Sequence, residues 1–531
     1  MVARNGNVAR IFFTFAFIGI GVSLASSSSS LKNVVHIISD DLRPELGAYG
    51  APFAHTPNID SIAKGGTVFD RAYANQAVCG PSRNSIYSGR RPDRSRTWNF
   101  INHFREDHPE WTSLPGLFLK HDEFVSIAAG KTYHPNQPPL YDGDKSWSEM
   151  ALPYYNPCWN TADNSNASFK DGGLPCLPCP IDLEHYILKK KISVANEFCQ
   201  LDALEDTYSV RRAVELMTKA VKMGKKFYLG LGFHKPHLPW QYSPEDYEIH
   251  AYQNISLPKH RMPPVHMPDI AFHMSDGDAH PNPWVPISDD DTITARRNYL
   301  AAVTGMDRKL GVFLKAIEDL GIENETAVIL HGDHGWHLGE HGLWRKMTNF
   351  ELATRVPFIA KIPWLETVER SADFVELVDL LPTIAELAGV PLPSNETFDG
   401  VSFVSAIDKS TSSTASKKQA AFSQYPRYVK PGEPQWGDNG IIHSDRSKFT
   451  HMGMTIRTHE WRYTEWVAWN KSALKPIWTN VTARELYDWR PITRAYPTDF
   501  DEGENENVVS CAENVAIVEK LSKMLRQQFD I

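Results

Sequence analysis

Three apolar segments of this 531-residue chain each end at a cluster of polar side chains, and this pattern restricts the fold more than any other feature. Continuous runs rich in valine, isoleucine and leucine are typical of strands that are buried on both faces of a sheet. The segments cover residues 34–39, 227–233 and 327–331, and they are followed by Asp40 and Asp41, by His234, and by Asp333 and His334.

Apolar residues at helical spacing lie between these segments. From Tyr299 to Leu320 they recur at alternating steps of four and three residues, which predicts an amphipathic helix. Residues 206–221 show a similar pattern, and Gly224 is a plausible stop. Alternating strands and helices predict an α/β fold with a large mixed, mostly parallel sheet flanked by helices. Ligands bind beyond the carboxyl ends of such strands, where the polar clusters fall.

The length allows one large domain and a smaller one. We expect a signal peptide over residues 1–25, a catalytic α/β domain over 31–435 and a C-terminal α+β subdomain over 436–531. Aromatic residues dominate the last of these, and alternating stretches such as 461–466 predict a small antiparallel sheet there.

The N-terminus has the pattern of a secretory signal. Arg4 and Arg10 supply a positive end before an apolar run, 11–24, that is shorter than the roughly 20 residues needed to cross a bilayer. A membrane anchor is the alternative, but no second apolar segment approaches spanning length. Asn-X-Ser/Thr sequons also indicate a secretory route, and they stand at Asn166, Asn254, Asn324, Asn395, Asn470 and Asn480.

Six cysteines fit an oxidising compartment. Four of them cluster in sequence, and we expect one or two disulfides among them; a structural zinc site is the alternative. The cluster comprises Cys158, Cys176, Cys179 and Cys199, whereas Cys511 is distant and Cys79 stands alone. The net charge of −9 argues against a nucleic-acid partner, so an anionic substrate would need a local basic pocket.

Adjacent carboxylates at a strand end repel each other and resist desolvation, and a divalent cation removes both costs. The pairs Asp40-Asp41 and Asp333-His334 together offer several oxygen ligands and one imidazole, which suits calcium or magnesium. The alternative is that these residues only cap helices or form turns.

The segment Cys79-Gly80-Pro81-Ser82-Arg83, continuing to Ser88-Gly89-Arg90, resembles the signature of type I sulfatases. In that family the cysteine is oxidised during secretion to formylglycine by a formylglycine-generating enzyme, and one hydroxyl of the hydrated aldehyde attacks sulfur. Ser88 stands where threonine is usual, which is a mild departure. The alternative is a buried structural cysteine beside a turn.

The resemblance extends over about residues 34–490 and implies the alkaline-phosphatase-like sulfatase fold. Further matching blocks are 130–135, 232–239 and 333–336. Several stretches are similar specifically to the iduronate-2-sulfatase group, and they comprise 90–93, 234–237, 338–346, 421–427, 456–458 and 462–464.

Residue roles follow from this resemblance. It implies that one Ca²⁺ per chain is bound by Asp40, Asp41, Asp333 and His334 together with the modified Cys79. Arg83 would steady the aldehyde hydrate, and Lys131 and Lys346 would hold the sulfate oxygens. His134 would act as the base that collapses the sulfated intermediate, and His234 would contact the bridging oxygen and protonate the leaving sugar hydroxyl.

The implied activity is removal of the 2-O-sulfate from iduronate in heparan and dermatan sulfate. Another exo-acting glycan sulfatase is the first alternative, followed by a phosphohydrolase of the same fold and a non-catalytic binder of sulfated glycans. The expected partners are a sulfated glycosaminoglycan substrate and the formylglycine-generating enzyme, with no nucleic acid and no stable membrane insertion. The expected destination is the lysosome, with the extracellular space as the alternative.

Overall fold

The computed structural model describes residues 31–151, 205–273, 284–410, 418–436, 440–492 and 502–529. The predicted signal peptide, the sequon at Asn166 and the cluster of four cysteines lie outside these residues. Cys511 is half-buried and forms no disulfide with another described cysteine. Within the described residues, no helix combines the length and the apolar character needed to cross a membrane.

The large sheet has eight strands in the order β10-β2-β9-β6-β1-β5-β3-β4. Only β9 runs antiparallel to its neighbours, so the predicted mixed, mostly parallel sheet is confirmed. The strands are β1 (Asn33–Ser39), β2 (Thr67–Tyr73), β3 (Phe124–Gly130), β4 (Glu149–Ala151), β5 (Lys226–Phe233), β6 (Thr326–Gly332), β9 (Arg355–Lys361) and β10 (Arg370–Glu376).

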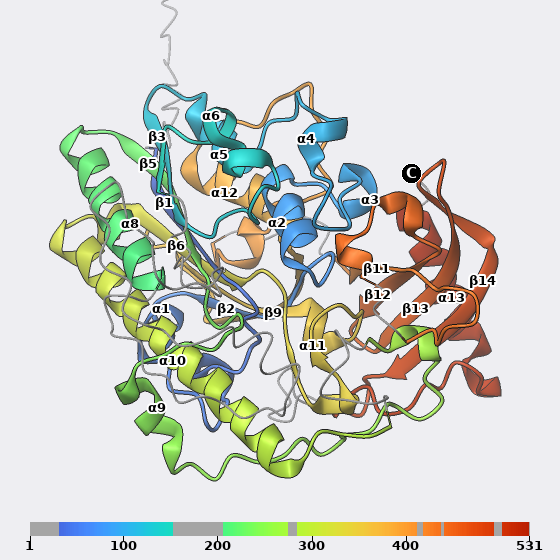
Figure 1. Ribbon diagram of the computed structural model, residues 1–531. Helices are drawn as coiled ribbons and strands as arrows, with labels where there is room; N and C mark the ends of the chain where they lie inside the picture. The colour runs from blue at the N-terminus through green and yellow to red at the C-terminus, as the bar shows by residue number, and fades with distance from the viewer. Residues whose placement is uncertain are drawn as a thin grey trace, which may run out of the picture. The chain divides into compact units, whose positions relative to one another are not determined.

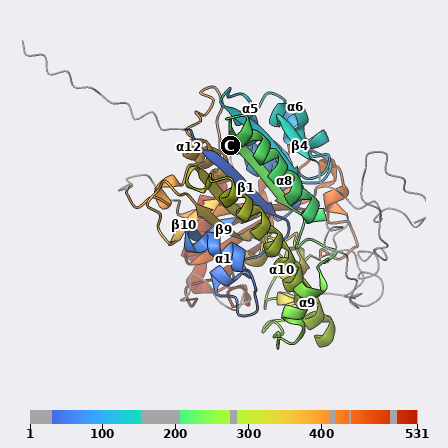
Figure 2. The ribbon, with the colours of Figure 1, turned by 90° about the vertical axis from the view of Figure 1, so that its left-hand side faces the viewer.

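Both faces of this sheet are covered, because the central strands carry apolar side chains on both sides. All seven residues of β1 are buried. Val35 and Ile37 pack in one core with residues of α8 (Glu205–Lys222) and α10 (Asp289–Asp319). Val34 and Ile38 pack in a second core with residues of α5 (Leu114–Leu119) and α12 (Leu380–Ala388). Figure 2 shows α8 and α10 lying across β1 on the first of these faces.

The predicted amphipathic helices are both present. The stripe that begins at Tyr299 belongs to α10, which starts at Asp289 and buries every predicted stripe residue from Tyr299 to Ile317. The remaining helices are shorter. In chain order the helices are α1 (Pro57–Lys64), α2 (Cys79–Ser88), α3 (Pro92–Ser95), α4 (Phe104–Asp107), α5 (Leu114–Leu119), α6 (Gly143–Ser146), α8 (Glu205–Lys222), α9 (Pro244–Ala251), α10 (Asp289–Asp319), α11 (Glu351–Thr354), α12 (Leu380–Ala388) and α13 (Val515–Phe529).

A four-stranded antiparallel sheet forms the C-terminal part, and α13 packs on it through Leu521, Leu525 and Phe529 (Figure 1). Its first strand lies before residue 436, where the sequence places the start of the subdomain. The strands are β11 (Ala420–Arg427), β12 (His451–Thr458), β13 (Trp461–Asn470) and β14 (Lys475–Asp488); a two-stranded hairpin of β7 (His337–Leu338) and β8 (Trp344–Arg345) precedes them in the chain.

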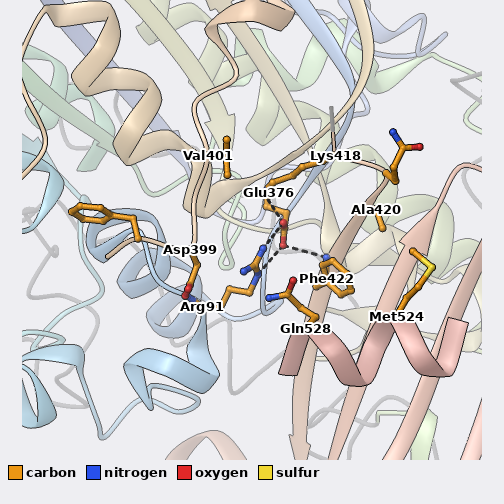
Figure 3. A pocket seen from close by; sticks show the side chains of 11 residues that line it. Arg91, Glu376, Asp399, Val401, Lys418, Ala420, Phe422, Met524 and Gln528 are labelled. Carbon is orange, nitrogen blue, oxygen red and sulfur yellow. Dashed lines mark hydrogen bonds and ion pairs between the residues drawn. The ribbon is translucent and has the colours of Figure 1, made fainter. Parts of the chain in front are cut away.

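Buried charges join the two sheets around a cavity of about 430 Å³. Arg91 pairs with Glu376 at 2.6 Å, and Glu376 also accepts the backbone N–H of Phe422 on β11 at 3.2 Å (Figure 3). Lys418 lies 2.7 Å from the same carboxylate. The lining residues include none of the predicted site residues, so this cavity belongs to the junction between the sheets.

Candidate active site

Four neighbouring parallel strands place the site residues along one edge of the large sheet. Ser39 of β1 is in register with Phe233 of β5 and with Gly332 of β6, so the residues that follow these strands meet. Lys131 follows β3, the next strand along. Gly232 permits this arrangement, because a Cβ at that position would lie 2.0 Å from the backbone carbonyl of Lys131.

Cys79 is the first residue of α2, a helix whose ten residues are all buried. Its Sγ lies 3.1 Å from Asp40 Oδ1 and 3.3 Å from His334 Nε2. Burial and the neighbouring Asp40 raise the pKa of this thiol, so the unmodified side chain stays protonated and is a poor nucleophile. A cysteine that has to be converted before it acts fits this environment.

A carboxylate and imidazole cluster surrounds Cys79. Ligand atoms of Asp40, Cys79, Asp333 and His334 lie within 4.8 Å of one another. His334 Nδ1 lies 3.0 Å from the carbonyl oxygen of Gly335, and Nε2 lies 3.5 Å from Asp333 Oδ1 and from Asp41 Oδ1. Burial lowers the pKa of His334, so its ring is neutral and able to ligate a metal.

These residues fit a hard divalent cation. Asp41 Oδ2 is fully buried and has no hydrogen-bond partner among the described residues. Burial raises the pKa of Asp41 to about 8 and that of Asp333 to about 6, with Asp40 contributing in both cases. Three buried carboxylates and one imidazole are a donor set that suits calcium or magnesium.

Three cations balance the three carboxylates. Arg83 donates from Nε to Asp333 Oδ2 at 2.9 Å and also bonds the carbonyls of Lys131 and Thr132. Lys131 Nζ pairs with Asp40. Lys346 Nζ lies 2.5 Å from Asp41 Oδ1 and 3.0 Å from Cys79 Sγ. The buried centre therefore holds as many cationic as acidic side chains, although the whole chain is acidic.

The loop that carries Lys346 has a strained backbone. Arg345 and Met347, on either side of it, have φ values of 65° and 77°, and His341 has a φ of 56°. Left-handed conformations of non-glycine residues cost about 1–3 kcal/mol each and gather at functional sites. The loop thus holds the lysine in a position that regular structure would not give it.

His134 lies at the side of this centre. Its ring stacks on Phe100 at a centroid distance of 4.2 Å, and Nδ1 lies 3.2 Å from the carbonyl oxygen of Pro135. His134 and Cys79 both lie in the part of the chain that the structure describes, and no hydrogen bond joins them. Burial and the charge of Lys131 lower the pKa of His134, so its ring is neutral and can accept a proton.

His234 has two acidic neighbours that the sequence did not single out. Glu205 Oε2 lies 2.6 Å from His234 Nδ1, and Asp206 accepts the backbone N–H groups of His234 and Lys235. A further histidine, His237, stacks on His234 at 4.9 Å and lies near Asp40. The acidic pair at the start of the predicted helix was visible in the sequence, but nothing there linked it to a histidine 29 residues away.

A mostly parallel α/β sheet that gathers carboxylates, a histidine and a cysteine at its carboxyl edge is the arrangement of the alkaline-phosphatase-like fold. The family model described as Sulfatase matches residues 32–390, and the chain belongs to this family.

Individual relatives agree with this assignment. Iduronate 2-sulfatase of Homo sapiens is 31% identical over 523 residues, which cover 87% of this chain and 90% of that protein. A solved structure of a protein with its substrate D-glucosamine-2-N,6-O-disulfate has a TM-score of 0.65 at 18% identity, covering 94% of this chain and 98% of that one. A phosphonate monoester hydrolase from Silicibacter pomeroyi has a TM-score of 0.67 at 20% identity, covering 94% and 95%. These two structures share the fold, and the chain is a sulfatase.

Proposed function

We propose that this sulfatase removes the 2-O-sulfate of iduronate at the non-reducing end of heparan and dermatan sulfate. The support is the 31% identity to iduronate 2-sulfatase over most of both chains, which extends beyond the shared catalytic core into the C-terminal sheet. We also propose that it acts in the secretory pathway, with the lysosome as its main destination.

The single observation that carries the chemistry is the position of Cys79 at the buried start of α2, within hydrogen-bonding distance of Asp40, His334 and Lys346. We infer that Cys79 is converted to formylglycine by the formylglycine-generating enzyme. Once formed, this group would supply the nucleophilic hydroxyl at position 79. Asp40, Asp41, Asp333 and His334 would hold Ca²⁺, which supplies Lewis-acid charge next to the reacting sulfate.

The remaining residues act on the charge and protons of the ester. Lys131, Lys346 and Arg83 neutralise the sulfate oxygens and stabilise the charge that spreads in the transition state. His134, held neutral, would accept a proton as sulfate is released, and His234 would deliver one to the leaving sugar oxygen. These roles require the cations to be fixed before substrate arrives, and their buried pairings with Asp40, Asp41 and Asp333 fix them.

The test is turnover by protein purified from cells that modify sulfatases. We expect hydrolysis of an iduronate-2-sulfate disaccharide and, by mass spectrometry, loss of the thiol in the peptide that contains Cys79. Cys79→Ala is expected to abolish turnover. No turnover of the disaccharide together with good turnover of a glucosamine-6-sulfate substrate would replace the substrate assignment, and preference for a phosphate ester would end the proposal.

A further inference from the structure

Glu205 is a buried carboxyl group that the proposed reaction does not yet use. It is the first residue of α8, its side chain is only 6% exposed, and Oε2 lies 2.6 Å from His234 Nδ1. The other oxygen, Oε1, is buried without a hydrogen-bond partner among the described residues. The carboxyl group is therefore engaged with one partner, the imidazole of His234.

The backbone of His234 is fixed from the same turn of helix. Asp206 accepts the N–H of His234 at 2.7 Å through Oδ1 and the N–H of Lys235 at 3.0 Å through Oδ2. The ring and the main chain of His234 are thus held by adjacent residues of α8. Because α8 packs along β5, which ends at Phe233, the start of the helix and the end of the strand meet at this point (Figure 1).

We propose that Glu205 is a positioning residue that orients His234 and keeps a proton on its Nε2 for delivery to the leaving sugar oxygen. The inference rests on the proposed function, in which His234 protonates that oxygen. The hydrogen bond to Nδ1 turns Nε2 away from Glu205. Glu205 itself does not need to touch the substrate, because it acts through the imidazole.

The proton balance of the pair explains why a carboxyl group is useful here. Glu205 and the ring of His234 together hold two protons, which is one more than a glutamate ion and a neutral imidazole hold. Whether that proton is bonded to Glu205 or to Nδ1, Nε2 bears a hydrogen. When the bond from sulfur to the bridging oxygen breaks, the Nε2 proton moves to that oxygen. The pair is left as a glutamate ion hydrogen-bonded to Nδ1–H of a neutral ring.

The surroundings favour retention of this proton. Burial, reinforced by the negative charge of Asp206, raises the pKa of Glu205 to about 8. Burial and the positive charges of Lys235 and Lys131 lower the pKa of His234. An isolated imidazole in this place would lose its second proton at acidic pH. Glu205 and His234 together keep that additional proton up to about pH 8.

The experiment compares Glu205→Gln with the wild-type enzyme on the iduronate-2-sulfate disaccharide. General acid catalysis contributes about 10²- to 10⁴-fold, so we expect kcat to fall by about 100-fold while KM changes by less than about threefold. The fall in rate on the alkaline side should move to lower pH, and Glu205→Asp should recover part of the activity. The matched control is Glu215→Gln, which makes the same change at an exposed position of the same helix.

Two outcomes would overturn the inference. One is an unchanged kcat and pH profile in Glu205→Gln. The other is a loss of kcat with an unchanged pH profile and a lower Tm, which would make Glu205 only a structural residue of α8.

The proposed function and this inference can fail separately. A wild-type enzyme that does not hydrolyse the disaccharide refutes the function. In that case ¹⁵N NMR of labelled histidine, with His234 assigned through a His234→Asn variant, still tests the pair. We expect the protonation of the His234 ring to differ between the wild-type protein and Glu205→Gln, and identical titrations would refute the inference.

Discussion

Lys346 reaches the centre of the site from the loop after the two-residue strand β8, whereas Asp40, Lys131 and Asp333 follow strands of the large sheet. Its Nζ lies 3.0 Å from Cys79 Sγ and 2.5 Å from Asp41 Oδ1. Burial by itself would lower the pKa of Lys346, but the neighbouring Asp41 and Cys79 outweigh burial and raise this pKa. The lysine is therefore a permanent positive charge placed where the sulfate would lie.

We predict that Lys346→Ala lowers kcat/KM for the sulfate ester by about 10²- to 10³-fold, the usual effect of removing one preorganised donor to a developing charge. The measurement is steady-state hydrolysis of the disaccharide. The matched control is Lys315→Ala, which removes an exposed lysine on α10 and should leave the rate unchanged. A Lys346→Ala enzyme with wild-type kcat/KM would show that Lys346 does not contact the substrate.

The sequence predicted that the proposed metal ligands lie together, but it did not predict the contact between Glu205 and His234. Asp40, Asp41, Asp333 and His334 lie within three residues of the end of an apolar run, so knowledge of a parallel sheet is enough to bring them together. Glu205 meets His234 only because α8 begins where β5 ends, and that depends on how the helix packs. Sequence spacing carries no record of such a contact.

At the level of elements, the junction between the sheets is centred on Glu376 at the end of β10. Burial alone would raise the pKa of this carboxyl group, but the charges of Arg91 and Lys418 outweigh it and lower the pKa to about 2 (Figure 3). Because the folded pKa lies below the ordinary value of 4.5, the ion pairs contribute stability above about pH 4.5. That contribution is lost as the pH falls from there toward 2.

We predict that Glu376→Gln destabilises the protein by about 3 kcal/mol at pH 7, since it leaves the buried Arg91 without its carboxylate partner and leaves Lys418 with Asp379 alone. The difference in Tm between the variant and the wild-type protein should be constant from pH 7 to pH 5 and should narrow below pH 4.5. Thermal unfolding across this range measures it. Glu433→Gln, at a half-exposed ion pair, is the control and should change Tm little at any pH. A Tm difference between Glu376→Gln and the wild-type protein that widens at acidic pH would contradict the lowered pKa of Glu376.

Elements with a strong periodic pattern were predictable, and those without it were not. The stripe of α10 is confirmed, because its residues from Tyr299 to Ile317 are buried. Residues 298–307 are buried on every side of the helix, and side chains such as Lys315 and Glu318 face water toward its C-terminal end. Strand β11 escaped notice because most of its residues are buried, so it shows no alternation of polar and apolar residues. The four-stranded sheet therefore begins at Ala420, earlier than the change in composition near residue 435 suggests, and the pattern of β11 gave no sign of this earlier start.

At the scale of the whole molecule, the sequons bear on the proposed route through the secretory pathway. Each of the five asparagines within the described residues is exposed: Asn254, Asn324, Asn395, Asn470 and Asn480. Exposure makes these side chains accessible to glycan transfer. We predict that protein secreted from eukaryotic cells carries glycans at several of them, so that enzymatic deglycosylation lowers the mass in steps and single Asn→Gln variants each lose one step. A secreted chain whose mass does not change would refute this.

The proposed metal site gives the last prediction, because it would couple binding at one edge of the sheet to the stability of the whole chain. A cation that binds only the folded protein stabilises it, by about 2.7 kcal/mol when its free concentration is 100 times its Kd. Four buried groups from three separate segments of the chain meet only in the folded state, so Ca²⁺ should act in this way. We predict that removal of metal with EDTA lowers Tm and that added Ca²⁺ restores it. The Asp333→Asn variant should lose this response, whereas Asp319→Asn, at an exposed pair on α10, should retain it.

Equal Tm values with EDTA and with Ca²⁺ in the wild-type protein would mean that these carboxylates are held by Lys131, Lys346 and Arg83 alone, and the calcium assignment would have to be abandoned.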